Sequence, residues 1–367
     1  MASTAKRKST RKAAPKKTRA AAVAPRSGPV TLSEARALAR AKQPEIAARA
    51  LREAAQPPAS PVRVGEEREK LAQERRREIA RRVRDYKATM AIMKKRGARR
   101  PASKRAARPK RDDSVPDGGS FAPLQIFAEG DSWFDYPVPF FGGGIIPRLE
   151  DRLGVPILNL GKAGDEVRYM LGVEERKLLA EHLSEGCPAG GPWDVLLFSG
   201  GGNDIVDNPM ALWVRDWRPG AAPADLLHQA RFDAALGLVR AGYEDLIELR
   251  DKLSPTTRLI FQGYDFAIPD GRGICHLGPW LKPTFDLRGF PTQDAAFQVL
   301  KVMLKQFASL LSTLATHSNV TFINGQGTLA PKKSSWHNEL HPSRDGFEKF
   351  AEVFRRELKA LYPGRVA

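Results

Sequence analysis

Five short apolar runs, each followed by a longer amphipathic stretch, restrict what this chain can fold into from residue 121 onward. The runs are residues 124–128, 155–160, 194–199, 258–262 and 320–323. The stretches expected to be helical are residues 146–153, 165–186, 225–253, 294–317 and 343–362. Strands that alternate with helices form βαβ units, and apolar runs without alternation are typical of buried parallel strands. The pattern therefore predicts a three-layer α/β sandwich around a five-stranded parallel sheet.

Positive charge is concentrated before this region. Residues 1–120 hold 34 Lys and Arg against 12 Asp and Glu, a net charge of +22, whereas residues 121–367 hold 26 against 30, a net charge of −4. Such an asymmetry predicts a basic extension that makes non-specific contact with a polyanion, such as nucleic acid or anionic lipid. The alternative is a solvated segment that only aids solubility.

The composition divides the extension into three parts. Residues 1–30 contain no acidic residue and few large apolar ones, so they are expected to form a disordered basic tail. Residues 31–95 are rich in helix-forming charged residues, and residues 96–120 form a basic linker rich in Pro and Gly. The globular domain is expected to occupy residues 121–367.

Two helical segments are expected within residues 31–95. Thr31 and Glu34 form a capping box at the start of the first, and Pro44 divides residues 31–55 into two short helices. Residues 66–95 are expected to form one long charged helix. Its apolar stripe is thin, which predicts a helix that is weakly packed or that depends on a partner. The stripe consists of Leu71, Ile79, Val83, Met90 and Met93.

Two further features bear on location and metal content. No apolar run approaches the length of a membrane-spanning helix, and no secretory signal is recognisable, so a cytoplasmic location is expected. Cys187 and Cys275 are the two cysteines of the sequence. Their pairing cannot be read from the sequence, and two buried free thiols are the simplest expectation. Without a repeated Cys/His spacing, no structural metal site is expected.

Polar residues follow each predicted strand, where a parallel α/β sheet places its ligand site. These residues include one Ser, one Asn and one His with obvious chemical use. In chain order they are Gly130-Asp131-Ser132, Gly161 to Gly164, Gly201-Gly202-Asn203-Asp204, Tyr264-Asp265 and Asn338-Glu339-Leu340-His341.

Residues 121–362 resemble the SGNH/GDSL hydrolases, a family of esterases and lipases. The resemblance is carried by Gly130-Asp131-Ser132, Gly164, the block ending in Asn203-Asp204, and the block ending in His341. Each block alone is a weak signal, but four in the family's order, each after a predicted strand, are a strong one. The resemblance implies a flavodoxin-like sheet and hydrolysis of a small-molecule, lipid or glycan ester.

The chemistry of these residue types agrees with that function. A Ser hydroxyl becomes a good nucleophile when a neighbouring base accepts its proton, which assigns Ser132 as nucleophile and His341 as base. The resemblance assigns the oxyanion hole to the backbone N–H groups of Ser132 and Gly164 and to the side-chain amide of Asn203. Such a mechanism requires neither a metal nor a cofactor. Asp131 and Asp204 are expected to be structural, because carboxylates in tight turns often accept backbone N–H groups.

One position departs from the family pattern. The family usually has Asp three residues before its His, and this chain has Asn338. An Asn carbonyl can orient the imidazole but cannot stabilise imidazolium by charge. Asn338 is the expected orienting residue, with Glu339 as an alternative acid. The departure also leaves open a catalytically weakened relative that only binds an ester or glycan.

The substrate pocket is the least determined feature. Trp133, Tyr264 and Asp265 are candidates for its wall because they follow predicted strands. The loops at residues 205–224 and 264–292 carry several aromatic residues. They are expected to form either a lid or wall over the site or a small satellite core.

Overall fold

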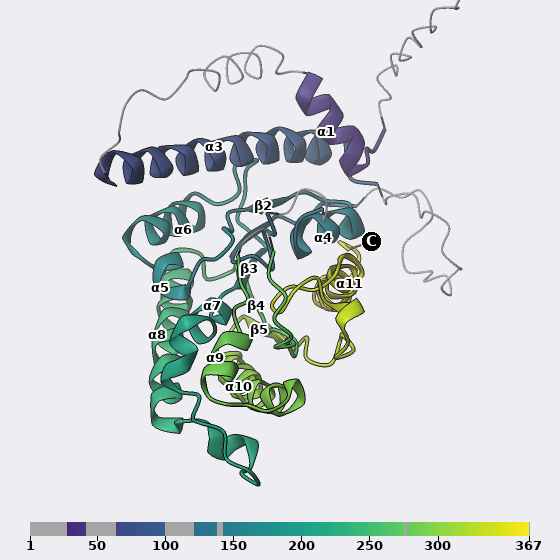
Figure 1. Cartoon of the computed structure of the whole chain (residues 1–367). Helices are drawn as coiled ribbons and strands as arrows, with labels where there is room; N and C mark the ends of the chain where they lie inside the picture. The colour runs from purple at the N-terminus through teal and green to yellow at the C-terminus, as the bar shows by residue number, and fades with distance from the viewer. Residues whose placement is uncertain (1–27, 42–63, 100–120, 138–141, 275–276, 367) are drawn as a thin grey trace, which may run out of the picture.

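The computed structural model describes residues 28–41, 64–99, 121–137, 142–274 and 277–366 (Figure 1). The expected basic tail falls outside the described residues except at its last three positions, and so do most of the linker, Pro44 and Cys275. The tail, the linker and the second short helix remain sequence predictions.

Five parallel strands form the single sheet, as the apolar runs predict. They are β1 (Ile126–Gly130), β2 (Ile157–Asn159), β3 (Val195–Ser199), β4 (Arg258–Gln262) and β5 (Val320–Ile323). Their order is β2-β1-β3-β4-β5, which leaves β2 at one edge and β5 at the other. Residue Ile126 pairs with Ile157 on one side and Val195 on the other. The carboxyl ends of all five strands therefore share one edge of the sheet.

Helices cover both faces of this sheet, which confirms the three-layer α/β architecture (Figure 1). Helix α4 packs against α11 on one side, and α5, α6 and α7 pack against α8 on the other. Helix α10 contacts β5 and α8. The bounds are α4 (Ile145–Leu153), α5 (Val167–Met170), α6 (Val173–Glu185), α7 (Gly202–Ile205), α8 (Gln229–Leu253), α9 (Lys282–Leu287), α10 (Gln293–Leu314) and α11 (Arg344–Leu361); three short 3-10 helices are η2 (Asn208–Leu212), η3 (Pro223–Leu226) and η4 (Lys333–Ser335).

Two predicted helices are wrong in their continuity. The helix expected over residues 165–186 is two helices, because the backbone is extended at Gly172, with φ −70° and ψ 171°. The helix expected over residues 225–253 begins only at Gln229, and the turn before it is a 3-10 helix that starts at Pro223. In addition, β1 begins two residues later than its apolar run, at Ile126.

The basic extension contributes two described helices, α1 (Leu32–Ala41) and α3 (Val64–Arg96). The predicted capping box is present, since the Thr31 N–H donates to Glu34 at 2.9 Å and the Glu34 N–H donates to the Thr31 hydroxyl at 3.3 Å. Ala98 forms isolated bridges with Val30 and Phe121. These bridges join the start of α1, the end of α3 and the approach to β1, so residues 97–99 of the expected linker are ordered against the domain.

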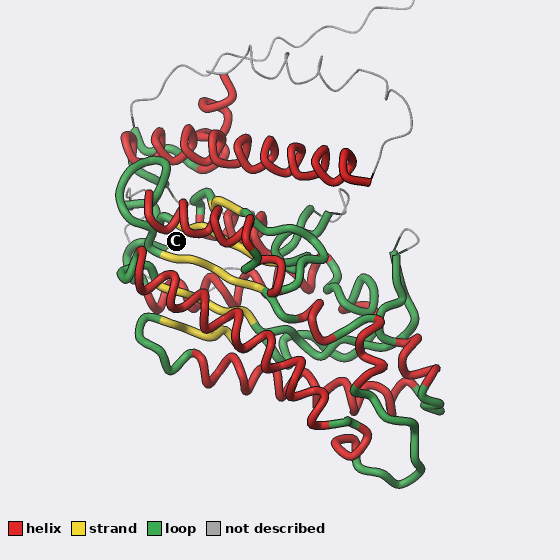
Figure 2. The backbone as a smooth tube through the Cα atoms, turned by 90° about the vertical axis from the view of Figure 1, so that its left-hand side faces the viewer, coloured by secondary structure: helices red, strands yellow, loops and turns green. Residues whose placement is uncertain are grey.

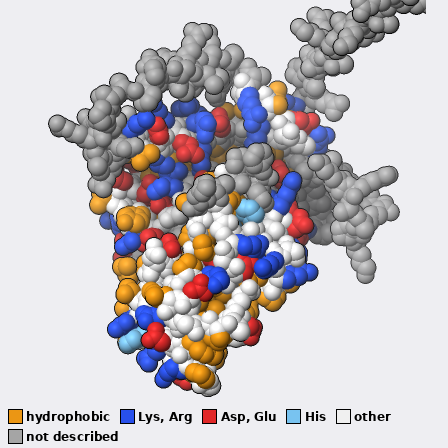
Figure 3. Space-filling view, viewed as in Figure 1, with side chains coloured by type: hydrophobic (Ala, Val, Ile, Leu, Met, Phe, Trp, Pro, Cys, Tyr) orange, Lys and Arg blue, Asp and Glu red, His pale blue; other side chains and the backbone are white. Residues whose placement is uncertain are grey.

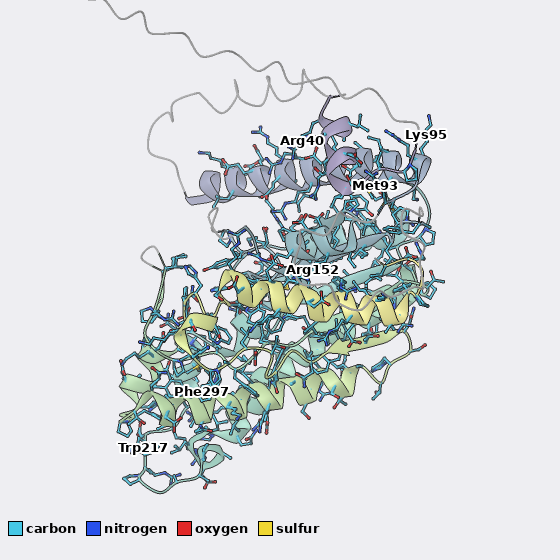
Figure 4. All side chains as sticks on the ribbon, turned by 90° about the vertical axis from the view of Figure 1, so that its right-hand side faces the viewer. Arg40, Met93, Lys95, Arg152, Trp217 and Phe297 are labelled. Atoms are coloured by element: carbon cyan, nitrogen blue, oxygen red, sulfur yellow. The ribbon has the colours of Figure 1, made fainter. Side chains whose placement is uncertain are left out.

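Helix α3 lies along the β2 edge of the sheet, as both tube and ribbon views show (Figures 1 and 2). Ile79, Met90 and Met93 are buried there, and the Tyr86 ring lies 5.5 Å from that of Trp193. Met93 and the exposed Lys95 are labelled in Figure 4. Most of the thin stripe therefore packs on the α/β domain itself, whereas Leu71, at its N-terminal end, is 61% exposed.

The outer surface around α3 mixes basic and acidic side chains (Figure 3). Arg76, Arg77, Arg81 and Arg84 are exposed on the helix, as are Glu74 and Asp85. In the part of the chain that the structure describes, no helix has the length and apolar character needed to cross a bilayer.

Candidate active site

The Ser and the His meet at the carboxyl edge of the sheet. Ser132 follows β1 directly, and His341 lies in the loop that leads into α11. Ser132 Oγ is 2.6 Å from His341 Nε2, and His341 Nδ1 is 2.9 Å from Asn338 Oδ1. The side chains expected to act as nucleophile, base and orienting group therefore form one hydrogen-bonded chain, although 209 residues separate the first two.

Asn338 fixes the tautomer of this imidazole. Its Oδ1 accepts the backbone N–H groups of Leu340, at 3.0 Å, and His341, at 2.9 Å. An amide oxygen can only accept hydrogen bonds, so the His341 Nδ1 beside it carries the hydrogen. The lone pair of Nε2 then faces Ser132, as a general base requires.

The prediction of Glu339 as an alternative acid beside His341 is wrong. The Glu339 carboxylate points away from the imidazole and accepts four backbone N–H groups, from Gly271, Trp280, Leu281 and Lys282, at 2.7–3.0 Å. The side chain is fully buried. It therefore ties Gly271 and residues 280–282 to the segment that carries His341.

Tyr136 is a site residue that the sequence analysis missed. Its ring stacks on that of His341, with centroids 4.4 Å apart and planes at 27°. Its hydroxyl accepts from Asn338 Nδ2 at 3.2 Å and lies 2.6 Å from Nδ1 of His337. Tyr136 thereby anchors the far side of the Asn338 amide. The only sequence signal for Tyr136 was its position four residues after Ser132, and its residue type did not indicate a role.

The surroundings of His341 keep its imidazole neutral. Burial, followed by the neighbouring His337, lowers the pKa of His341 to about 3. A carboxylate in place of Asn338 would oppose this by favouring imidazolium. The resting site therefore has an available base throughout the neutral range, without a charged partner.

The expected oxyanion donors lie on three loops of the same edge. Among the described residues, the N–H groups of Ser132 and Gly164 have no hydrogen-bond acceptor. Gly164 has φ +81°, a conformation that favours glycine. Asn203 donates one of its two side-chain N–H groups to the Asp165 carbonyl at 2.8 Å, which leaves the second for a ligand.

The Asn203-Asp204 pair also fastens the Gly164 loop. While Asn203 donates to the Asp165 carbonyl, Asp204 accepts the N–H of Val167 at 2.9 Å. Burial raises the pKa of Asp204 to about 6. This pair joins the loop after β3 to residues 165–167 of the loop after β2.

Asp131 is structural, as its place in a tight turn predicts. Its carboxylate accepts the N–H of Trp133 and the hydroxyls of Ser199 and Tyr264. Burial raises its pKa to about 6 despite these bonds. The turn that carries Ser132 is therefore tied to β3 and to the loop after β4.

A match to a protein-family model assigns the chain that carries these residues to a family. The model for the GDSL-like lipase/acylhydrolase family matches residues 129–349, which include Ser132, Asn203 and His341. The chain belongs to this family. The match covers more than half of the sequence and excludes α1 and α3.

Solved structures resemble the family domain at low sequence identity. The lipase Lip_vut3 from a goat rumen metagenome is 18% identical, with a TM-score of 0.41 over 64% of this chain and 96% of that chain. The extracellular lipase of Streptomyces rimosus is 14% identical, with a TM-score of 0.41 over 64% and 99%. The salicylyl-acyltransferase SsfX3 of a tetracycline biosynthetic pathway is 18% identical, with a TM-score of 0.35 over 68% and 58%. No curated protein sequence matches the chain. Because the TM-scores lie below 0.5, the family match carries the assignment.

A small cavity opens beside the Ser and the His of this family member. Its volume is about 40 Å³. Trp133, Tyr264 and Asp265 contribute to its lining, but Gly164 does not. Much of the apolar wall comes from Val206 and Ala267, which lie in the two loops considered for a wall, and from Leu300, Leu304 and Leu340, which had no sequence signal.

The polar groups of Trp133, Tyr264 and Asp265 are nevertheless hydrogen-bonded to other parts of the protein. The Trp133 indole donates to the Leu340 carbonyl at 3.1 Å, and the Tyr264 hydroxyl donates to Asp131. Asp265 accepts the N–H groups of Phe266, Gly327 and Leu329 at 2.7–2.8 Å. These contacts hold the three side chains in the walls of the cavity, and the Asp265 carboxylate is used mainly to bind backbone N–H groups.

The two aromatic loops mainly form a satellite core. Trp213 packs on Phe232, and Trp217 packs on Phe290. Trp280 is the exception, since its ring lies edge-on to His341 at 6.0 Å. Among the described residues, no three His, Cys, Asp or Glu side chains gather as metal ligands. Cys187 is buried and free.

Proposed function

We propose that this protein hydrolyses carboxylic esters through an acyl-enzyme on Ser132. The observation that carries the proposal is the 2.6 Å contact between Ser132 Oγ and the lone pair of His341 Nε2. Family membership supports acyl hydrolysis in general. The residue roles and the ester class are the proposal.

The reaction balances with the groups present. Ser132 Oγ attacks the ester carbonyl while His341 Nε2 takes its proton, and the carbonyl oxygen becomes an oxyanion. The N–H groups of Ser132, Gly164 and Asn203 stabilise that oxyanion. As the tetrahedral intermediate collapses, His341 returns the proton to the departing alkoxide. Water, deprotonated by His341, then attacks the acyl-enzyme. As the second tetrahedral intermediate collapses, His341 gives that proton to the departing Ser132 Oγ, which releases the carboxylic acid and restores Ser132.

The cavity supports a short acyl group. Its volume is about 40 Å³, little more than a few water molecules, and aliphatic side chains line much of it. Leu300 and Leu304 come from α10 and are buried in the core, which limits how far this part of the wall can yield to a longer chain. We therefore propose acetyl to butyryl esters as preferred substrates.

The test is hydrolysis of p-nitrophenyl acetate, butyrate and octanoate by the full chain, with Ser132→Ala as the matched variant. We expect turnover that falls with acyl length in the wild type and is abolished in the variant. Labelling by a fluorophosphonate probe should follow the same pattern.

The competing hypothesis, a relative that only binds esters or glycans, predicts the opposite result. It requires that Ser132 resist the probe and that the wild type and Ser132→Ala hydrolyse each ester at the same background rate. Equal rates together with an unlabelled wild type would overturn the esterase proposal.

A further inference from the structure

Helix α3 reaches the Gly164 loop from the side opposite to Asn203. Arg75 and Arg82 lie seven residues apart, which places them two turns apart on one face of the helix. Their side chains are only 16% and 20% exposed. Both guanidinium groups end at the backbone that leaves β2.

The carbonyls they meet belong to the edge of the sheet. Arg82 Nη1 donates to the carbonyls of Asn159, at 2.9 Å, and Gly161, at 3.3 Å. Arg75 donates to the carbonyls of Leu160 and, at 3.4 Å, of Gly161. Among the described residues, no further strand pairs with the outer side of β2, which is an edge strand. The two arginines supply donors to the last carbonyl of β2 and to the two carbonyls that follow it.

Arg82 also binds the turn that carries the nucleophile. Its Nη2 donates to Asp135 Oδ2 at 2.9 Å, and the Asp135 N–H donates to the Asp131 carbonyl at 3.0 Å. Asp135 thus closes the turn that contains Ser132. One guanidinium connects the nucleophile turn to the start of the loop that presents Gly164.

The same loop is pressed tightly against the nucleophile strand. The Lys162 N–H donates to the Gly130 carbonyl at 2.7 Å. A Cβ added to Gly161 would lie 2.8 Å from that same carbonyl oxygen, so no side chain fits there. A loop packed this closely cannot shift without moving the end of β1.

We propose that Arg82, supported by Arg75, is a positioning residue that sets the Gly164 loop relative to Ser132. The inference rests on the proposed function, since it assigns these arginines to the oxyanion hole of that reaction. It makes the basic helix part of the catalytic framework. The arginines act through the loop and do not touch the substrate.

The expected effect is on the chemical step. Oxyanion donors act through exact placement, and a displacement of about 1 Å can cost on the order of 100-fold in rate. Arg82→Met removes the charge and the donors but keeps most of the aliphatic stem. We expect kcat to fall about tenfold with KM changed less than twofold, because binding in the cavity does not use the loop. Arg82→Lys keeps a donor within reach and should recover part of the loss.

The matched control is Arg81→Met. Arg81 is the preceding residue on the same helix and is exposed. The experiment measures kcat and KM for p-nitrophenyl acetate, and the hydrogen exchange of residues 160–167 by mass spectrometry, in the full-length wild type and the three variants. We expect the largest increase in exchange of this segment in Arg82→Met, a smaller increase in Arg82→Lys and none in Arg81→Met, with exchange in α10 unchanged.

Three results would overturn the proposal. They are unchanged exchange and unchanged kcat in Arg82→Met, an equal loss in Arg81→Met, or faster exchange throughout the domain, which would make Arg82 a general stabilising residue. If Arg82→Met does not fold, Arg82→Lys carries the same comparison. If the wild type itself hydrolyses no ester, the proposed function fails, and the exchange data still decide whether Arg82 holds the loop.

Discussion

The loop that carries Gly164 is held from two sides by different means. On one side lie Asn203 and Asp204, which follow β3, and on the other lie Arg75 and Arg82 of α3. From β3, Asn203 and Asp204 bind the loop through residues 165–167, using an uncharged amide and a buried carboxyl. From α3, Arg75 and Arg82 bind its other end through backbone carbonyls. The first pair belongs to a recognisable motif, whereas the second comes from a helix with ten other arginines and lysines.

The difference lies in how much chemistry each side contributes. Asn203 is both a fastener and a donor to the proposed oxyanion, so it must be Asn. The arginines only fasten, so any donor that reached the same carbonyls would serve. A residue that must donate to the reacting atoms has to be of one type at one place in the sequence. A residue that only holds a loop in place does not.

Loss of Asn203 should give the largest effect. Asn203→Ala removes a proposed oxyanion donor together with the bond to Asp165, and removal of one such donor typically costs about 100- to 1000-fold in kcat. Steady-state kinetics on p-nitrophenyl acetate measures this. A loss no greater than that of Arg82→Met would erase the distinction between the two sides.

The adjacent residues Asn338 and Glu339 allow a direct test, because the first contacts the His341 imidazole and the second only holds backbone. Asn338→Asp places a carboxylate 2.9 Å from His341 Nδ1, which raises the pKa of that imidazole from about 3. Protonated imidazole cannot act as base, so the acid limb of the kcat/KM profile should move at least one pH unit toward neutral. Turnover at pH 8 should rise, because the carboxylate stabilises imidazolium.

Glu339→Gln should leave that acid limb where it is. Its carboxylate holds four backbone N–H groups and does not touch the imidazole. An amide can accept fewer of these bonds, so the free energy of unfolding should fall by about 2–3 kcal/mol. Urea unfolding measures the loss, and a displaced pH profile in this variant would contradict the assignment.

A buried acid, Glu129 of β1, lies near Arg75 of α3. Glu129, three residues before Ser132, is 1% exposed, and burial raises its pKa to about 8 against the opposing charge of Arg75. A folded-state pKa above the unfolded value means that stability is greatest at low pH and declines as pH rises from about 4.5 to 8.

Glu129→Gln removes this titration and keeps the acceptor for the Gly130 N–H. The variant should therefore match the wild type at pH 5 and be more stable by about 2–4 kcal/mol at pH 9, as measured by urea unfolding. An equal stability difference at the two pH values would show that Glu129 does not titrate in this range.

The smallest effect concerns the outer face of α3. The non-specific polyanion contact through residues 1–120 remains a proposal, and its candidates on α3 are the exposed Arg76, Arg77, Arg81 and Arg84. Changing these four to Gln should weaken binding of double-stranded DNA at low salt and reduce its salt dependence by about 0.9 per lost phosphate contact. Ester hydrolysis should stay unchanged. Equal DNA affinity in both proteins would remove α3 from this contact.

The sequence predicted the fold well because the relevant signals are local. The apolar runs placed β4 and β5 at their observed bounds, and the Thr31–Glu34 pair marked the start of α1. Helix continuity failed at Gly172, where a single extended residue outweighed the amphipathic pattern on both sides. Such a break depends on how α5 and α6 pack on α8, which no local pattern records.

By itself, the sequence determined the sheet, the family and the residues that its chemistry requires, since a nucleophile, its base and an amide donor must be particular residue types. Only the tertiary structure decided between Asn338 and Glu339, brought Tyr136 onto His341, and separated Arg82 from Arg81. Each of those distinctions rests on the direction of a side chain. Direction is set by packing between segments distant in the sequence, so neighbours of the same type can have unrelated roles.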